Sequence, residues 1–304
     1  MRACVAGAGS IGSLFAAHLA TVTDVVVLTR RGDHARELNE RGLRVSGRHD
    51  FTARVTATSD PRELSDVGLV IVATKATGVE GAASALAGRV QGATVMTVQN
   101  GLGAEEIVRA HGEWPLVSGV TFMSGTKHSD SHVEYILDTP TWIGPYGRTP
   151  FEHVQEIAQL IVDAGLKAEA LPDLLPAQWS KLIFNATVNG VAALTGLPHG
   201  AHFAEEKELG DLGHLVHGLV DEGKRVAAAA GVELHDDPWE MNVLATRRGS
   251  AHYPSMLEDV EAHRPTEVEL INGALVREAE RAGVDAPLQT AVYRLVKARE
   301  ASYS

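Results

Sequence analysis

The chain has 304 residues, which suggests roughly two domains at about 150 residues per domain. Hydrophobic residues make up 44% and charged residues 22% of the sequence, a globular balance that excludes general disorder. The 39 acidic residues outnumber the 27 basic ones and give a net charge of −12, which disfavours nucleic acid as a partner because the surface would repel phosphate. The single cysteine, Cys4, excludes an internal disulfide and a cysteine-cluster metal site, and it fits a reducing cytoplasm.

Apolar runs and helix-like segments alternate along the first half of the chain. The runs cover 3–6, 24–28, 67–73 and 93–98, with helical spacing over 13–20 and 33–40. Because the runs are continuously apolar and rich in valine, they predict parallel strands buried on both faces. We therefore expect an α/β fold that begins with a Rossmann-type, doubly wound parallel sheet.

Helical patterns take over after a predicted helix at 150–164 and a short strand at 167–171. We place a nucleotide-binding domain at 1–170 and an all-helical substrate domain at 171–304. No run of about 18 apolar residues occurs, so a membrane span is not expected.

A glycine-rich loop follows the first predicted strand. Its sequence is Gly7-Ala8-Gly9-Ser10-Ile11-Gly12, which matches the dinucleotide-binding pattern G-x-G-x-x-G. The first glycine allows a tight turn, the second lets the backbone approach a pyrophosphate, and the third lets helix and strand pack closely. The apolar stretch 3–20 faintly resembles a signal peptide, but the glycine spacing is better explained by this loop.

The end of the second predicted strand indicates which dinucleotide is bound. NAD sites usually carry an acidic residue there, whereas this chain has Arg30 and Arg31, which suit the 2′-phosphate of NADP. Asp33 lies two residues further on and is the evidence for NAD. Lys75 and Asn100 follow the third and fourth predicted strands, where ligands of open α/β sheets bind. Taken alone, each of these two residues is more often a turn residue than a ligand contact.

The helical half contains a polar stripe. Lys181, Asn185 and Asn189 are spaced by four residues and therefore share one helix face. The stripe could face solvent, as on an ordinary amphipathic helix. Two asparagines are unusual on a solvated face, so the pattern favours a stripe that faces a cleft.

A second polar segment follows towards the C-terminus. Ser255 and Asp259 lie one helical turn apart, and Thr266 with Glu269 fits a capping box at the start of another helix. Glu267 would then lie in the first turn, where a carboxylate is favoured by the helix dipole. The 14 histidines show no metal-ligand spacing with a third ligand, so no metal is expected.

Taken together, these motifs resemble the ketopantoate reductase (2-dehydropantoate 2-reductase) family. The resemblance rests on segments that run in order along nearly the whole chain: Gly7-x-Gly9-x-x-Gly12, Thr74-Lys75-Ala76, Gln99-Asn100-Gly101, Trp179-x-Lys181-Leu182 with Asn185 and Asn189, Ser255-Met-Leu-x-Asp259, and Arg264-x-Thr266-Glu267.

The resemblance implies an NADPH-dependent enzyme that reduces the 2-keto group of ketopantoate on the way to pantothenate and coenzyme A. It implies Lys181 as the acid/base, with Glu267 beside it in the catalytic machinery. Asn100, Asn185, Asn189 and Ser255 would hold substrate or organise the lysine. Arg30 or Arg31 would read the 2′-phosphate, and Lys75, with Asn100, would lie on the cofactor side.

The chain departs from the family pattern at one substrate-side position. Where the family often has Pro-Asn-Gly, this chain has Pro198-His199-Gly200. This change points to one alternative to ketopantoate reduction, an NADPH reductase for another 2-ketoacid or carbonyl compound in specialised metabolism. A separate alternative is a non-catalytic NADP sensor that uses the fold as a switch. Lys181 and Glu267 argue against it, since a sensor needs no proton donor. We expect a cytoplasmic enzyme that binds a small-molecule 2-ketoacid substrate and neither nucleic acid nor a membrane. Apolar helical surface in the second domain fits a homodimer interface or the core of that domain equally well.

Overall fold

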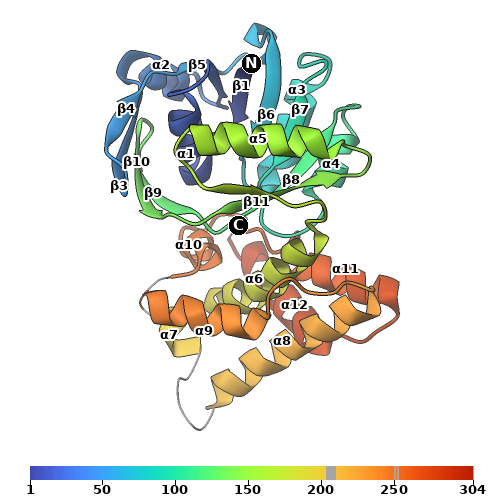
Figure 1. Ribbon diagram of the computed structural model, residues 1–304. Helices are drawn as coiled ribbons and strands as arrows, with labels where there is room; N and C mark the ends of the chain where they lie inside the picture. The colour runs from blue at the N-terminus through green and yellow to red at the C-terminus, as the bar shows by residue number, and fades with distance from the viewer. Residues whose placement is uncertain (203–209, 250, 252, 304) are drawn as a thin grey trace. The chain divides into compact units, whose positions relative to one another are not determined.

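The computed structural model describes residues 1–202, 210–249, 251 and 253–303 (Figure 1). The chain divides into two compact units. The first comprises Met1–Gln99 and Ala104–Leu174, and the second comprises Asn100–Gly103 and Leu175–Ser304. Within the described ranges, every helix is too short or too polar to cross a lipid bilayer.

The first unit is built on an eight-stranded sheet in the order β12-β11-β8-β7-β6-β1-β2-β5. Its strands are β1 (Arg2–Ala6), β2 (Val25–Leu28), β5 (Thr56–Thr58), β6 (Val67–Val72), β7 (Thr94–Thr97), β8 (Leu116–Thr121), β11 (Thr141–Tyr146) and β12 (Ala168–Ala170). The strands from β5 to β8 pair in parallel, and only β11 runs antiparallel to its neighbour β8. The predicted doubly wound, mainly parallel sheet is therefore confirmed.

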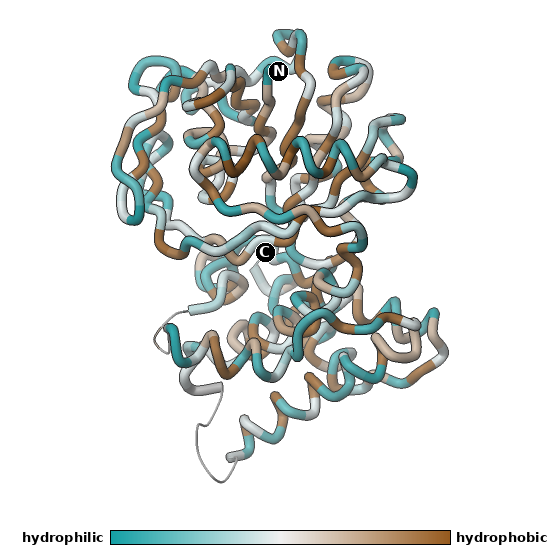
Figure 2. Tube along the Cα trace, viewed as in Figure 1, coloured by the Kyte–Doolittle hydropathy of each residue, from teal (hydrophilic) through white to brown (hydrophobic). Residues whose placement is uncertain are grey.

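Helices cover this sheet because its strands are apolar on both faces. They are α1 (Ser10–Leu19), α2 (Gly32–Arg41), α3 (Val79–Leu86), α4 (Ala104–Arg109) and α5 (Phe151–Asp163), with short 3₁₀ turns η1 (Pro61–Glu63) and η2 (Ala76–Gly78). Leu14 of α1 and Ile157 of α5 share one apolar core with Val5 and Ile71 of the sheet. The trace of α5 alternates between hydrophobic and hydrophilic residues, as expected for a helix with one buried face (Figure 2).

A second, four-stranded sheet in the first unit has the order β4-β3-β10-β9. Its strands are β3 (Leu43–Gly47), β4 (Phe51–Ala53), β9 (Ser124–Ser129) and β10 (His132–Leu137). Its inner face joins the core around α1 through Val45, Val133 and Tyr135. The sequence did not predict this sheet because its strands lack a continuous apolar run, and β9, with the sequence SGTKHS, is polar along its whole length.

The regular elements among the described residues of the second unit are all helices, joined by turns. It contains α6 (Leu175–Thr195), α7 (His199–His202), α8 (Asp211–Ala229), α9 (Pro238–Gly249), α10 (Ser255–Glu261), α11 (Asn272–Ala282) and α12 (Pro287–Ala301). Helix α6 lies at the centre and contacts each of the others, so most of its side chains are buried. This unit has an apolar core of its own, which includes Trp179, Ile183 and Leu219.

The predicted capping box at Thr266 and Glu269 is wrong. Helix α11 starts only at Asn272, and the residues before it form turns. The backbone N–H of Thr266 donates to Glu300 at 2.6 Å instead of to Glu269, whose carboxylate pairs with Arg277 at 2.7 Å. Tertiary partners on other helices therefore replace the local cap, and Glu267 lies in a turn before the helix.

Candidate functional site

The glycine loop joins β1 to α1 as predicted. Gly7 has a φ of +104°, which favours glycine, and a Cβ added at Gly12 would overlap the carbonyl oxygen of Gly7. At Gly9, by contrast, an added Cβ would meet nothing within 4 Å. The loop is thus closed where strand and helix pack and open at its middle glycine. The first N–H groups of α1, at Ser10 and Ile11, start the helix there, so the backbone fits a pyrophosphate.

The predicted cofactor residues follow neighbouring parallel strands of the first unit. Arg30 and Arg31 follow β2 after one intervening residue, Thr29, and both are exposed. Lys75 follows β6 closely, where it precedes the 3₁₀ turn η2 and is also exposed. Since β1, β2 and β6 are parallel, their carboxyl ends form one edge of the sheet. The glycine loop, the two arginines and Lys75 therefore belong to the same edge.

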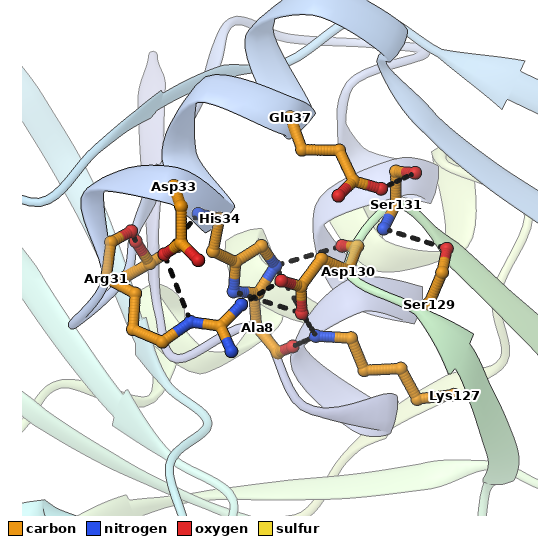
Figure 3. Close-up of polar contacts among 10 residues, drawn as sticks. Ala8, Arg31, Asp33, His34, Glu37, Lys127, Ser129, Asp130 and Ser131 are labelled. Carbon is orange, nitrogen blue, oxygen red and sulfur yellow. Dashed lines mark hydrogen bonds and ion pairs between the residues drawn. The ribbon is translucent and has the colours of Figure 1, made fainter.

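Sequence reasoning missed two residues that the structure places beside this loop. Lys127 of β9 donates from Nζ to the carbonyl oxygen of Ala8 at 2.7 Å, and Asp130 forms an ion pair with Arg31 (Figure 3). Neither residue belongs to a recognisable sequence motif. Their proximity depends on the pairing of the second sheet, which the sequence pattern did not reveal.

The predicted polar stripe of the second unit is buried. The exposed fractions of Lys181, Asn185 and Asn189 on α6 are 8%, 6% and 5%. A solvent-facing stripe is therefore excluded. Polar side chains at this depth require partners, because an unpaired buried polar group costs free energy.

A chain of hydrogen bonds connects the two asparagines with three other predicted site residues of the second unit, Asn100, Ser255 and Glu267. Asn100 donates to Glu267 at 3.0 Å, Asn185 donates to Asn100 at 3.4 Å, Asn189 donates to Asn185 at 3.4 Å, and Ser255 donates to Asn189 at 3.4 Å. The backbone N–H of Met256 also donates to Asn189, at 3.2 Å. Residues that lie up to 167 positions apart are therefore brought together in one polar cluster.

The position of Asn100 depends on a tight turn next to it. Gly101 has a φ of +95°, and an added Cβ would overlap the carbonyl oxygen of Leu270. The same carbonyl accepts a hydrogen bond from the N–H of Leu102 at 2.9 Å. The short segment Asn100–Gly103 is thus fixed against the turn that carries Glu267.

Burial determines the acid–base behaviour of Lys181. Desolvation lowers the pKa of Lys181 to about 8, and the negative charge of Glu267 acts in the opposite direction. A lysine with this pKa is mostly protonated at neutral pH but gives up its proton more readily than an exposed lysine. Lys181 can therefore supply a proton, and the neutral amides of the polar cluster can orient a polar ligand.

His199, the residue that departs from the family pattern, is buried in the second unit. Its ring stacks on Phe184 with centroids 6.2 Å apart and an interplanar angle of 20°. Phe184 directly precedes Asn185, so the histidine packs against the helix that carries the polar stripe.

Comparisons with known proteins agree with this arrangement. The family described as ketopantoate reductase PanE/ApbA matches residues 3–148, and its C-terminal domain matches residues 173–300. A 2-dehydropantoate 2-reductase of Archaeoglobus fulgidus is 31% identical over 299 residues, which cover 98% of each chain.

Solved structures also share the fold. A PanE/ApbA family ketopantoate reductase from Ralstonia eutropha aligns with a TM-score of 0.90 at 25% identity, over 100% of this chain and 99% of the other. A D-mandelate dehydrogenase with NADH and anilino(oxo)acetate aligns with a TM-score of 0.88 over the same shares of the two chains; at 24% identity it shows the fold alone. The chain therefore belongs to the ketopantoate reductase family and is an oxidoreductase that acts on a CH–OH group.

Proposed function

We propose that this protein uses NADPH to reduce the 2-keto group of ketopantoate to the alcohol of pantoate, the step that leads to pantothenate. The observation that carries the proposal is the buried Lys181, whose pKa lies near 8 and whose helix face carries two buried asparagines. Relatives named 2-dehydropantoate 2-reductase, which align over nearly the whole chain, support this choice of substrate.

The proposed chemistry assigns the proton to Lys181. When bound, reduced nicotinamide supplies a hydride to the carbonyl carbon, which leaves negative charge on the oxygen. The ammonium group of Lys181 stabilises that charge and gives its proton to the oxygen. Glu267 keeps the lysine protonated because its negative charge raises the pKa of Lys181.

The amides of the cluster would bind the rest of the substrate. Asn185, Asn189 and Ser255 offer uncharged donors and acceptors for the hydroxyl and carboxylate groups of ketopantoate. Asn100 donates to Glu267 and thereby fixes the carboxylate that acts on the lysine. The hydrogen bonds that join Asn100, Asn185, Asn189 and Ser255 are long, at 3.4 Å, and therefore weak. Exchanging them for hydrogen bonds to a ligand would cost little free energy.

The dinucleotide would be held by the first unit. The open backbone at Gly9 and the start of α1 fit its pyrophosphate, with Gly7, Ala8, Ser10, Ile11 and Gly12 completing the loop. Arg30 or Arg31 after β2 suits a 2′-phosphate, and Lys75 suits the cofactor side of the same edge.

Steady-state oxidation of reduced nicotinamide tests this proposal. Ketopantoate is compared with a panel of other 2-ketoacids, and NADPH is compared with NADH. We expect turnover of ketopantoate that is selective for NADPH. Absence of turnover with ketopantoate, in a protein that binds NADPH, would reject the proposed substrate.

Reduction of another 2-ketoacid is a second candidate, and the buried His199 is the observation that favours it. The H199N variant restores the residue common in the family. If the histidine selects another substrate, H199N should gain kcat/KM for ketopantoate and lose it for that 2-ketoacid. Equal kcat/KM for ketopantoate in the two proteins would show that the histidine is a tolerated variation.

A further inference from the structure

A cluster of charged side chains surrounds the end of β2 in the first unit. Arg31 forms ion pairs with Asp130 and, at 3.3 Å, with Asp33 (Figure 3). Lys127 lies 3.3 Å from Asp130 and donates to the carbonyl oxygen of Ala8 in the glycine loop. The carboxylate of Asp130 therefore bridges two cations: Lys127 of β9 and Arg31, which follows β2.

Helix α2 fixes the turn that carries Asp130. His34 lies 2.9 Å from the backbone carbonyl of Asp130, and because a carbonyl only accepts, the ring nitrogen donates. Ser131 donates to Glu37 at 2.6 Å. Burial lowers the pKa of His34 to about 4, so its ring is neutral near pH 7 and adds no charge to the cluster. The β9–β10 turn is thus held against α2 from two points.

The surroundings of Lys127 disfavour an ammonium group that has no anion beside it. Its side chain is only 24% exposed, and burial together with the charge of Arg31 lowers the pKa of Lys127 to about 8. A half-buried ammonium near a guanidinium is stabilised by a shared anion. The carboxylate of Asp130 is such an anion, since it pairs with both Lys127 and Arg31.

The Asp130 carboxylate lies near the end of β2, where dinucleotide-binding folds hold part of their cofactor. In dinucleotide-binding folds, the residues directly after the second strand contact the adenosine ribose and its 2′-substituent. Arg31 lies in the segment between β2 and α2, and Lys127 of β9 pairs with the same Asp130 carboxylate as Arg31.

We propose that Lys127 is a further cofactor-contact residue that binds the 2′-phosphate of NADPH, and that Asp130 acts as its competitor. On binding, the phosphate takes the place of the Asp130 carboxylate on Lys127 and Arg31. The Asp130 carboxylate holds both cations in position before the cofactor arrives and weakens phosphate binding by competing for them. This inference rests on the proposed NADPH dependence and adds the residues that determine it.

Binding titrations with the whole protein test the role of Lys127. The dissociation constants of NADPH and NADH are measured by nicotinamide fluorescence for wild type, K127M and K127R. We expect K127M to weaken NADPH about tenfold or more, the value of one hydrogen bond to a charged group, and to leave NADH unchanged. K127R should restore most of the affinity. K167M removes a lysine that pairs with Asp138 elsewhere in this unit, and it should change neither constant.

Two results would overturn the assignment of Lys127. Equal weakening of NADPH and NADH by K127M would mean that the lysine only supports the glycine loop through Ala8. Unchanged affinity for both would mean that it contacts neither nucleotide. Failure of wild type to prefer NADPH would instead count against the proposed cofactor, which separates the two proposals.

Asp130 gives an independent test with the opposite sign. Because D130N removes the competing charge, it should tighten NADPH by roughly two- to fivefold, in keeping with the strength of partly exposed ion pairs. D33N removes a carboxylate that pairs with the same arginine but is more exposed, and its effect should be smaller. A loss of NADPH affinity in D130N would show that Asp130 positions the cations without competing for them.

Discussion

Lys181 combines two opposing influences on one ammonium group. Burial disfavours its charged form, whereas Glu267 favours it, and the resulting pKa of about 8 lies close to neutral pH. A proton donor works best when its pKa is near the operating pH. The exact balance between burial and the carboxylate therefore determines how the enzyme responds to pH.

This balance predicts a specific pH profile. Because the proposed reduction needs protonated Lys181, kcat/KM should fall as the pH rises through about 8. E267Q removes the charge that raises the pKa of Lys181, so the fall should begin at lower pH. The pH dependence of kcat/KM is measured for both proteins. E269Q, which changes an exposed glutamate two residues away, should leave the profile in place.

If kcat/KM falls over the same pH range in E267Q as in wild type, the assigned role of Glu267 is contradicted. The carboxylate would then act on substrate or structure and not on the protonation of the lysine.

Residue-scale prediction succeeded where spacing along one helix carried the information. The four-residue spacing of Lys181, Asn185 and Asn189 places them on one face of α6, and the structure shows that face to be buried. Glu267 was assigned a functional role only through the family resemblance. Its contact with Asn100 spans 167 positions of sequence, and no local pattern encodes such a contact.

Two glycines of the glycine loop have different roles, one in packing and one in the proposed binding of cofactor. Gly12 faces the carbonyl of Gly7 in the strand–helix junction, whereas Gly9 faces open space. The sequence pattern predicts this division, because it assigns the second glycine to the pyrophosphate and the third to packing of helix on strand. The structure adds the atoms involved: the carbonyl oxygen of Gly7 and the side chain of Ala73 are what a Cβ at Gly12 would meet.

This difference yields a matched pair of variants. G12A should lower the free energy of unfolding by about 1–3 kcal/mol or more, because its methyl group forces strand and helix apart. G9A should unfold like wild type but lose NADPH affinity, because the methyl group occupies the space that the pyrophosphate needs. Denaturant unfolding and fluorescence titration measure the two effects.

Wild-type NADPH affinity in G9A would contradict the placement of the pyrophosphate at this loop. Wild-type stability in G12A would show that the junction can adapt to an extra methyl group.

Elements were predictable where their periodicity was strong. The parallel strands β1, β2, β6 and β7 are mainly apolar, and the structure places them side by side in the sheet. The start of α11 was not predictable, because Thr266 binds Glu300 of α12 instead of a residue within its own turn. A local capping signal fails when a distant carboxylate satisfies the same N–H group.

At the scale of the whole molecule, the two units have separate apolar cores and carry different parts of the proposed reaction. The first holds the glycine loop and the arginines after β2, and the second holds the lysine and its amides. The second sheet of the first unit escaped prediction because its strands lack a continuous apolar run. Its polar strand β9 nevertheless contributes the cation that contacts the glycine loop.

The account as a whole depends on Lys181 as the proton donor. K181M removes the ammonium group but keeps a long side chain, and it should fold stably because methionine carries no charge into the core. Since all proposed cofactor residues except Asn100 lie in the first unit, K181M should bind NADPH as wild type does.

The most direct test measures turnover of ketopantoate and NADPH affinity side by side in wild type and K181M. We predict that kcat falls by roughly 10²–10⁴-fold, the usual contribution of a positioned proton donor, while the dissociation constant of NADPH is unchanged. Turnover at the wild-type rate in K181M would contradict the account, because another group would then have to supply the proton.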